Sequence, residues 1–279
     1  MYDATIATHA DMPDGSTDDR LLADALIAAG ARVRLAVWND LTVDWAESGR
    51  VVIRSTWDYQ ERHDEYLRWV RSVPRILNPP EVIEWNTDKR YLAAVPGAVA
   101  TSFLAPGDVF AAPSGEYVVK PSVSAGSRDT ARFVPGDDDR AAALVARIHA
   151  GGRTALVQPY LHAVDDVGET ALLYFDGAYS HAIRKGAILR RGAEPTTEVF
   201  AAETIEPRDA PPDERELADR VVAFVRERFG DLAYTRVDLV RGDDGPQLLE
   251  LELTEPSLFF QQGPDAPERF AAAIRSRLG

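Results

Sequence analysis

The stretch from Tyr234 to Leu258 constrains the fold of this chain most, because it reads as a β-hairpin with acidic side chains on one face. A Gly-Asp-Asp-Gly-Pro turn signal separates two alternating runs. Side chains alternate faces along a strand, so Arg236 and Asp238 share one face of the first run, and Glu250 and Glu252 share one face of the second. A turn centred in this signal sets Asp238 opposite Glu250 and Arg236 opposite Glu252.

Carboxylates that face one another across a strand pair repel, unless a positive group lies between them. Mg²⁺ prefers oxygen ligands and is usually held by one or two carboxylates together with phosphate oxygens. The hairpin therefore predicts a magnesium site at Asp238, Glu250 and Glu252. The alternative is the solvated outer face of an edge hairpin. Against it, the opposite face is expected to pack on a core, since it is apolar at Val237, Leu239, Leu249, Leu251 and Leu253.

The composition excludes several kinds of protein. The chain has 279 residues and a formal net charge of -14, which opposes a general affinity for nucleic acid or for an anionic membrane surface. It has no cysteine, so disulfides, thiolate metal sites and cysteine nucleophiles are excluded. We see neither a signal peptide nor an apolar run of the roughly 20 residues that a membrane span requires. We expect a cytoplasmic protein.

Residues 1–80 are predicted to form a parallel α/β domain. Strands are expected at 4–8, 33–37 and 51–54, and helices from an N-cap at Thr17 and over 64–73. Ligands of such units lie beyond the carboxyl ends of the strands, here the loops 9–16 and 55–60. Trp57 and Tyr59 lie in the second loop, either as core aromatics or as substrate contacts. An Asn-Pro-Pro break at 78–80 ends the domain.

Residues 81–160 and 161–279 are predicted to be two α+β subdomains. In the first, a helix opens at 86–89, and a strand at 117–121 runs into a loop of small residues, 122–128. Small residues let the backbone approach phosphate closely, and Lys120 supplies a point charge, although a surface hairpin would read the same way. In the second, a hairpin ending in Arg184 and Lys185 and a long helix over 213–229 precede the acidic hairpin.

The order of these elements resembles the ATP-grasp superfamily: a helical lysine, a strand with lysine and proline before a small-residue loop, a hinge, a basic hairpin, then Arg-x-Asp and Glu-x-Glu. The resemblance covers roughly residues 80 to 260. It implies an α/β (α+β) ATP-grasp fold, in which an N-terminal α/β domain precedes two subdomains that clasp ATP. The implied ligands are ATP and Mg²⁺.

The resemblance also implies roles for particular residues. Those implied for the nucleotide are the phosphate lysines Lys89 and Lys120, the closing loop with Ser122, Ser124, Gly126 and Ser127, the adenine hinge Gln158, Tyr160 and Leu161, and the ribose acid Glu169, with Asp165 or Asp166 as alternatives. Those implied for catalysis and metal binding are Arg184 and Lys185 as contacts to phosphate or to the acyl intermediate, Arg236 at the transition state, and Asp238, Glu250 and Glu252 as magnesium ligands.

The chain departs from the family pattern in two places. Glu252 stands where asparagine is usual, and Glu255-Pro256-Ser257 replaces the usual Ser-Pro-Gly. The motifs look closer to the branch that contains the O-ureidoserine cyclo-ligase of cycloserine biosynthesis. That branch implies a carboxylate-amine ligase for a small amino-acid-like substrate, working through an acyl phosphate and either within one molecule or between two. A small-molecule kinase and a non-catalytic nucleotide-binding module are the alternatives, and a homodimer is left open.

Overall fold

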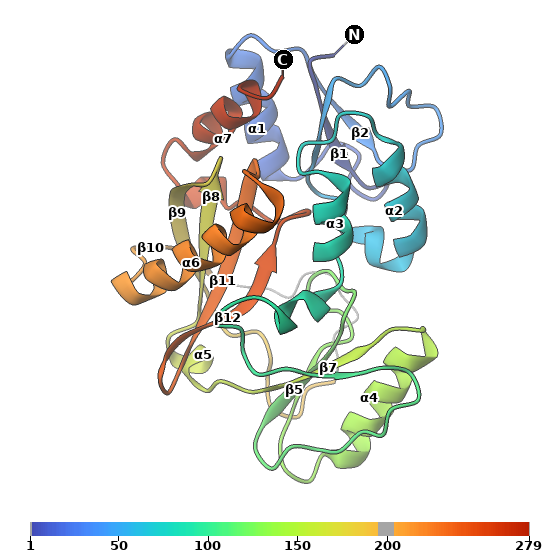
Figure 1. The fold of residues 1–279 in the computed structure, drawn as a ribbon, viewed down its shortest axis with the longest axis vertical. Coiled ribbons are helices and arrows are strands. Elements are labelled where there is room, and N and C mark those ends of the chain that lie inside the picture. Colours follow the sequence, from blue (N-terminus) through green and yellow to red (C-terminus); the bar gives the residue numbers. More distant parts are fainter. Residues whose placement is uncertain (1, 195–203, 279) are drawn as a thin grey trace.

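Three β-sheets lie along the long axis of the molecule, and the sheet that comes last in the chain lies between the other two (Figure 1). The computed structural model describes residues 2–194 and 204–278. The first sheet is parallel and the other two are antiparallel, so the predicted class, an α/β unit followed by two α+β units, is confirmed. None of the helices within the described ranges is long and apolar enough to cross a membrane.

The first sheet has the strand order β2-β1-β3. Its elements are β1 (Ala4–Thr8), α1 (Thr17–Ala28), β2 (Val33–Val37), β3 (Arg50–Ile53), the 3₁₀ turn η1 (Trp57–Glu61) and α2 (His63–Ser72). The expected N-cap at Thr17 is wrong by one residue. Ser16 caps α1, because its hydroxyl accepts from the backbone N–H of Asp19 and the Asp19 carboxylate accepts from the Ser16 N–H in return.

The second sheet has the order β4-β7-β5-β6, and helix α4 packs on it. Its elements are β4 (Ser102–Leu104), β5 (Tyr117–Pro121), β6 (Ala131–Phe133), α4 (Asp138–Ala150) and β7 (Ala155–Pro159). The helix expected to open at 86–89 is instead two pieces, α3 (Pro80–Asn86) and the 3₁₀ turn η2 (Lys89–Ala93). Pro80 begins α3 at its first turn, where a missing N–H costs nothing.

The third sheet has the order β10-β9-β8-β11-β12, and helix α6 packs on it. Its elements are α5 (Ala163–Asp166), β8 (Glu169–Phe175), β9 (Ala178–Lys185), β10 (Ile205–Arg208), α6 (Pro212–Phe229), β11 (Tyr234–Gly242) and β12 (Gly245–Glu252). The predicted pairing is confirmed, since Asp238 lies opposite Glu250 and Arg236 lies opposite Glu252.

A bulge in the acidic hairpin corrects one part of its predicted pattern. The register shifts after Asp238, so that Leu239 faces Leu248 rather than Leu249. Leu248 is fully buried in the core beneath the hairpin. The extra residue of a bulge is left outside the regular alternation, and Leu249 accordingly lines the cavity described below instead of the apolar face.

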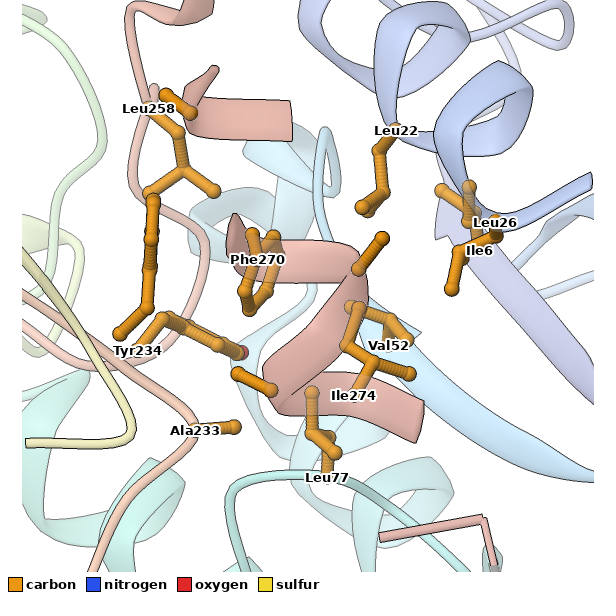
Figure 2. Close-up of a cluster of buried hydrophobic side chains, with 14 of the residues drawn as sticks. Ile6, Leu22, Leu26, Val52, Leu77, Ala233, Tyr234, Leu258, Phe270 and Ile274 are labelled. Carbon is orange, nitrogen blue, oxygen red and sulfur yellow. The ribbon is translucent and has the colours of Figure 1, made fainter. Parts of the chain in front are cut away.

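The last helix, α7 (Ala266–Arg275), joins the first sheet to the third. Figure 2 shows Phe270 and Ile274 of α7 between Leu22 and Leu26 of α1 on one side and Tyr234 of β11 on the other. The 3₁₀ turn η3 (Phe260–Gln262) adds Phe260 to the same cluster. The start and the end of the chain therefore share one hydrophobic core.

Candidate active site

A cavity of about 420 Å³ is lined by residues of the second and third sheets and the loops around them, together with Trp57 and Tyr59 of η1 in the first domain. It brings together most of the site residues expected from the sequence: Lys89, Lys120, Ser124, Gly126, Ser127, Gln158, Tyr160, Leu161, Glu169, Lys185, Arg236, Glu250 and Glu252. A concave site of this size, with convergent polar groups, is where a small ligand is expected to bind.

The lysines of the chain are confined to this cavity. The sequence has only three, Lys89, Lys120 and Lys185, while every other strongly basic side chain is an arginine. All three lysines line the cavity, and each is less than a tenth exposed. Compact ammonium groups held in place at one point suit the binding of phosphate oxygens.

Lys89 and Lys120 differ in their partners. The ammonium of Lys89 donates to the Ser124 carbonyl at 2.6 Å and lies 3.1 Å from a Glu250 carboxylate oxygen. The ammonium of Lys120 makes neither a hydrogen bond nor an ion pair with any residue in the described ranges. Burial lowers the pKa of Lys120 from its usual value, and the neighbouring Lys89 adds to this effect. Lys120 is thus the cation of the cavity that most lacks an anionic partner.

Lys185 and Arg236 hold Asp238 between them. Lys185 Nζ lies 2.7 Å from Asp238 Oδ2 and 2.9 Å from a Glu169 oxygen. Arg236 donates two hydrogen bonds to the same carboxylate, from Nε and from Nη2, each at 2.8 Å. Although burial raises the pKa of Asp238, Arg236 and then Lys185 outweigh it and hold that pKa at about 2. Asp238 is 1% exposed and lies behind the residues that line the cavity.

Glu252 forms an ion pair with Arg236, yet it remains poorly compensated. Burial, together with the charges of Glu250 and Asp238, raises the pKa of Glu252 to about 7 against the opposing effect of Arg236. The pKa of Glu250 is lowered, because Lys89 and Lys120 outweigh its burial. A cation placed between Glu250 and Glu252 would relieve this repulsion.

The donor atoms present fit Mg²⁺. Glu250 and Glu252 line the cavity from the same face of β12, and both are oxygen donors. Across residues 2–194 and 204–278, no group of three Asp, Glu or His side chains is arranged to hold a metal ion. Each of the three predicted acids instead forms an ion pair with a lysine or arginine of the protein. Two carboxylates, completed by phosphate oxygens, are the arrangement that Mg²⁺ usually takes.

The small-residue loop after β5 rests on the first domain. Tyr59 donates its hydroxyl to the Ser124 carbonyl at 3.3 Å, and the Gln60 side chain accepts from the Ala125 N–H at 3.1 Å. Ser124, Gly126 and Ser127 line the cavity, whereas Ser122 is buried outside it and its carbonyl accepts from the Lys89 N–H. Only the later part of the loop, from Ser124 on, therefore lines the cavity.

The hinge after β7 lines the other end of the cavity. Gln158, Tyr160 and Leu161 lie there with an apolar group of side chains: Val118, Val164, Ile188, Leu189, Val240 and Leu249. The Tyr160 N–H donates to the Glu116 carbonyl and the Gln158 amide to Thr101, so both groups already have protein partners. A flat apolar ligand group suits this end.

The structure separates the three candidates for the ribose acid. Glu169 lines the cavity, where it is paired with Lys185. Asp165 is turned away, because it accepts from the Tyr160 hydroxyl and pairs with Arg132. Asp166 lines no part of the cavity formed by the described residues.

Arg184 does not reach the cavity. Neighbouring residues of a strand point to opposite faces, so Lys185 faces the site and Arg184 faces away. Its guanidinium donates to the backbone carbonyls of Asp166 and Val167 and lies 3.5 Å from Glu206. The expected contact of Arg184 with a ligand has no support in this geometry.

Sequence reasoning missed Glu255 as a site residue and left Trp57 and Tyr59 undecided. All three line the cavity. Burial, together with the charge of Glu252, raises the pKa of Glu255 to about 8. The one available signal for Glu255 was its departure from the family's Ser-Pro-Gly pattern.

Comparison with known proteins shows the family of the chain. Residues 4–78 match the family model for the N-terminal domain of D-cycloserine synthetase DcsG. The cycloserine biosynthesis protein DcsG of Streptomyces lavendulae is 39% identical over 92% of each chain. The crystal structure of D-cycloserine synthetase DcsG superposes with a TM-score of 0.89 at 36% identity, covering 99% of each chain.

A more distant structure shares the fold. The D-alanine–D-alanine ligase of Bacillus anthracis complexed with ATP superposes with a TM-score of 0.64 at 14% identity, covering 99% of this chain and 96% of the ligase. This identity shows likeness of fold alone, whereas the likeness to DcsG extends to the sequence. The chain therefore belongs to the DcsG family of ATP-grasp ligases.

Proposed function

We propose that this chain is an ADP-forming, Mg²⁺-dependent ligase of cycloserine biosynthesis, which activates the carboxylate of a small amino-acid-like substrate and joins it to a nitrogen. The observation that carries the proposal is the convergence of all three lysines, Arg236 and the β12 carboxylates on one cavity of a DcsG-family protein. Positive groups around the cavity favour a phosphate chain, and the paired acids favour a divalent cation.

The nucleotide would lie along the cavity from the hinge to the lysines. Gln158, Tyr160 and Leu161, with their apolar neighbours, would hold the adenine, and Glu169 would contact the ribose or the phosphates beside Lys185. Lys120, which has no partner within the described ranges, and Lys89 would bind the phosphates. Ser124, Gly126 and Ser127 would cover them from the loop after β5.

Glu250 and Glu252 would hold Mg²⁺. Asp238 would either stay paired with Lys185 behind these two ligands, or bind the ion as a third ligand when Lys185 leaves it to bind phosphate. When bound, the ion neutralises charge on the transferring phosphoryl group and orients it. The carboxylate of the substrate would attack the γ-phosphorus in line, and ADP would leave. Lys120 and Lys185 would balance the negative charge that spreads over the equatorial oxygens.

Arg236 would act in the second step. An attacking nitrogen adds to the acyl carbon of the acyl phosphate, and the acyl oxygen becomes negative before phosphate leaves. Arg236 lines the cavity between Glu252 and the loop at Ser257, and its pKa is raised because buried Asp238 and Glu252 outweigh its desolvation. It therefore stays charged when it donates to this oxyanion. If the nitrogen belongs to the same molecule, the product is a ring of the cycloserine type.

Hydroxylamine trapping tests this proposal. The protein is incubated with ATP, Mg²⁺ and O-ureido-D-serine, with or without hydroxylamine, and the products are identified by mass spectrometry. Without the trap we expect cycloserine, ADP and phosphate, with the carbamoyl group of the ureido moiety released by water as CO₂ and ammonia. With the trap we expect the hydroxamate of the substrate. A stable phosphorylated product that resists hydroxylamine indicates a kinase instead. AMP as the nucleotide product contradicts the acyl phosphate.

A further inference from the structure

The loop after β12 is fastened to the first domain by its backbone. Arg54 of the first domain donates Nη1 to the Pro256 carbonyl at 2.6 Å, and Trp57 donates its indole N–H to the Glu255 carbonyl at 3.1 Å. From the other side, Arg236 donates Nη1 to the Ser257 carbonyl at 3.1 Å. Three successive backbone carbonyls of this loop therefore accept hydrogen bonds. These bonds fix the backbone at Glu255, while its side chain is not used in them.

The anchoring extends further along the loop. The Asp18 carboxylate, at the start of α1, accepts from the backbone N–H groups of Leu258 at 2.9 Å and Phe259 at 2.8 Å. Arg54 is itself buried beside Asp19, with its Nε 3.3 Å from an Asp19 oxygen. Side chains that are held by such a supporting layer keep a fixed geometry toward a ligand.

Glu255 is the cavity carboxylate that lacks a cation. Glu169 pairs with Lys185, Glu250 with Lys89 and Glu252 with Arg236, each within ion-pair distance. In the part of the chain that the structure describes, the Glu255 carboxylate has neither a hydrogen bond nor an ion pair, although its residue lines the cavity. Burial and then the charge of Glu252 raise the pKa of Glu255, against the smaller opposing effects of Lys89 and Arg236. Glu255 is only partly exposed. A carboxylate withdrawn from most of its water and without a partner is costly, so a ligand cation would stabilise it.

The surroundings of Glu255 favour an organic cation. Trp57 and Tyr59 line the cavity with it, and aromatic rings attract ammonium groups. Arg236, with its positive charge, lies near the same end of the cavity through its bond to Ser257. A free amino acid carries a carboxylate and an ammonium group on one carbon. Arg236 and Glu255 offer the complementary pair of charges.

We propose that Glu255 is the specificity-determining residue that binds the primary ammonium group of the substrate. This inference rests on the proposed function for the identity of the substrate, but its test does not require turnover. Without the ammonium group, a substrate would leave Glu255 unpaired in the closed cavity, and sites built for a polar group reject ligands that lack it.

The test compares two ring compounds that differ only in the amine. D-cycloserine carries a primary amine, and 1,2-oxazolidin-3-one is the same ring without it. Calorimetry with ADP and Mg²⁺ present measures both Kd values for the unaltered protein and for Glu255→Gln, Glu255→Asp and the exposed control Glu81→Gln. We expect the unaltered protein and Glu81→Gln to bind D-cycloserine about 10- to 100-fold more tightly than the ring without the amine.

In Glu255→Gln this preference should fall to within about twofold, because only D-cycloserine loses affinity, and Glu255→Asp should retain part of it. An unchanged preference in Glu255→Gln overturns the proposal, as does the absence of any preference in the unaltered protein. A variant that instead requires more Mg²⁺ for ADP binding identifies Glu255 as a metal ligand and also overturns it. If the preference depends on Glu255 but hydroxylamine trapping fails, the binding assignment stands and the proposed ligase reaction does not.

Discussion

At the scale of single residues, Lys120 combines burial with the lack of an anionic partner among the described residues. Lys120→Met keeps the length of the side chain and removes its charge. We expect the Kd for ATP to rise about 10- to 100-fold, because a hydrogen bond between charged groups is lost. The free energy of unfolding without nucleotide should stay equal or increase, since an uncompensated buried charge has been removed.

Calorimetric titration with ATP and Mg²⁺, together with urea unfolding, measures both quantities. The matched control is Arg68→Met, an exposed cation of the first domain, which should change neither. An ATP affinity equal to that of the unaltered protein would remove Lys120 from the nucleotide site.

His181 makes the stability of the fold depend on pH. Burial lowers the pKa of His181 below its ordinary 6.5, and nearby Arg269 contributes to this effect. The unfolded chain binds a proton near pH 6.5, whereas the folded chain resists it until lower pH. Stability is therefore fully present above pH 6.5 and is lost as the pH falls through 6.5 toward the lower folded pKa.

The expected result is a fall in the free energy of unfolding between pH 7.5 and pH 5.5 that is smaller in His181→Gln. Urea unfolding at several pH values measures it, and His162→Gln is the control for a histidine of an exposed position. Parallel curves for the unaltered protein and His181→Gln would show that His181 does not cause the pH dependence.

At the scale of elements, the side chain of Asn86 continues the hydrogen bonding of β12. Its amide donates to the Leu251 carbonyl at 2.7 Å and its oxygen accepts from the Leu253 N–H at 2.7 Å. Asn86→Ala leaves the buried Leu253 N–H unpaired, whereas the Leu251 carbonyl keeps its second donor, the Tyr91 hydroxyl, at 2.7 Å. We expect a loss of about 1–3 kcal/mol in the free energy of unfolding, which is the cost of one unsatisfied buried group.

Urea unfolding of Asn86→Ala measures this loss. Asn39→Ala is the matched control, since the Asn39 side chain has no hydrogen bond within the described ranges and should cost less than about 0.5 kcal/mol. Equal stability of the two variants would mean that water replaces Asn86 at the edge of β12.

The acidic hairpin shows what periodicity can predict about an element. Alternation placed Arg236, Asp238, Glu250 and Glu252 correctly, because faces and pairing depend on a period of two and on the turn. Alternation predicted the wrong face of the hairpin for Leu249. A bulge adds a residue there, and no residue preference in the sequence indicates its position. The sequence therefore predicts the strands of the hairpin but not its interruption.

Much of the cavity could be predicted because most of its lysines and acids, apart from Lys89 and Glu255, occur at family spacings along regular strands. Arg184 and Lys185 were indistinguishable from composition, and only the register of β9 decides that Lys185 faces the site. Glu255 was missed for another reason. Its place depends on contacts with Arg54 and Trp57, which lie about two hundred residues earlier in the chain.

At the scale of the whole molecule, Phe270 connects the beginning of the chain to its end. It is fully buried, stacks on Phe175 of β8 and shares a core with Leu22 of α1. Phe270→Ala should lower the free energy of unfolding by about 3–5 kcal/mol. In this variant the first and third sheets should still unfold together, in a single thermal transition. Leu41→Ala, at a fully exposed position, should have no effect, and two separate transitions in the unaltered protein would contradict a shared core.

The confinement of the lysines has a consequence for chemical labelling. A reagent that acylates amines finds its side-chain targets only at Lys89, Lys120 and Lys185, all within one cavity. The side chains of the outer surface, whose strongly basic groups are arginines, do not react with such a reagent. Acylation measured by mass spectrometry with and without a bound ligand thus reads the occupancy of the cavity directly, and it can rank untested ligands without any knowledge of the reaction.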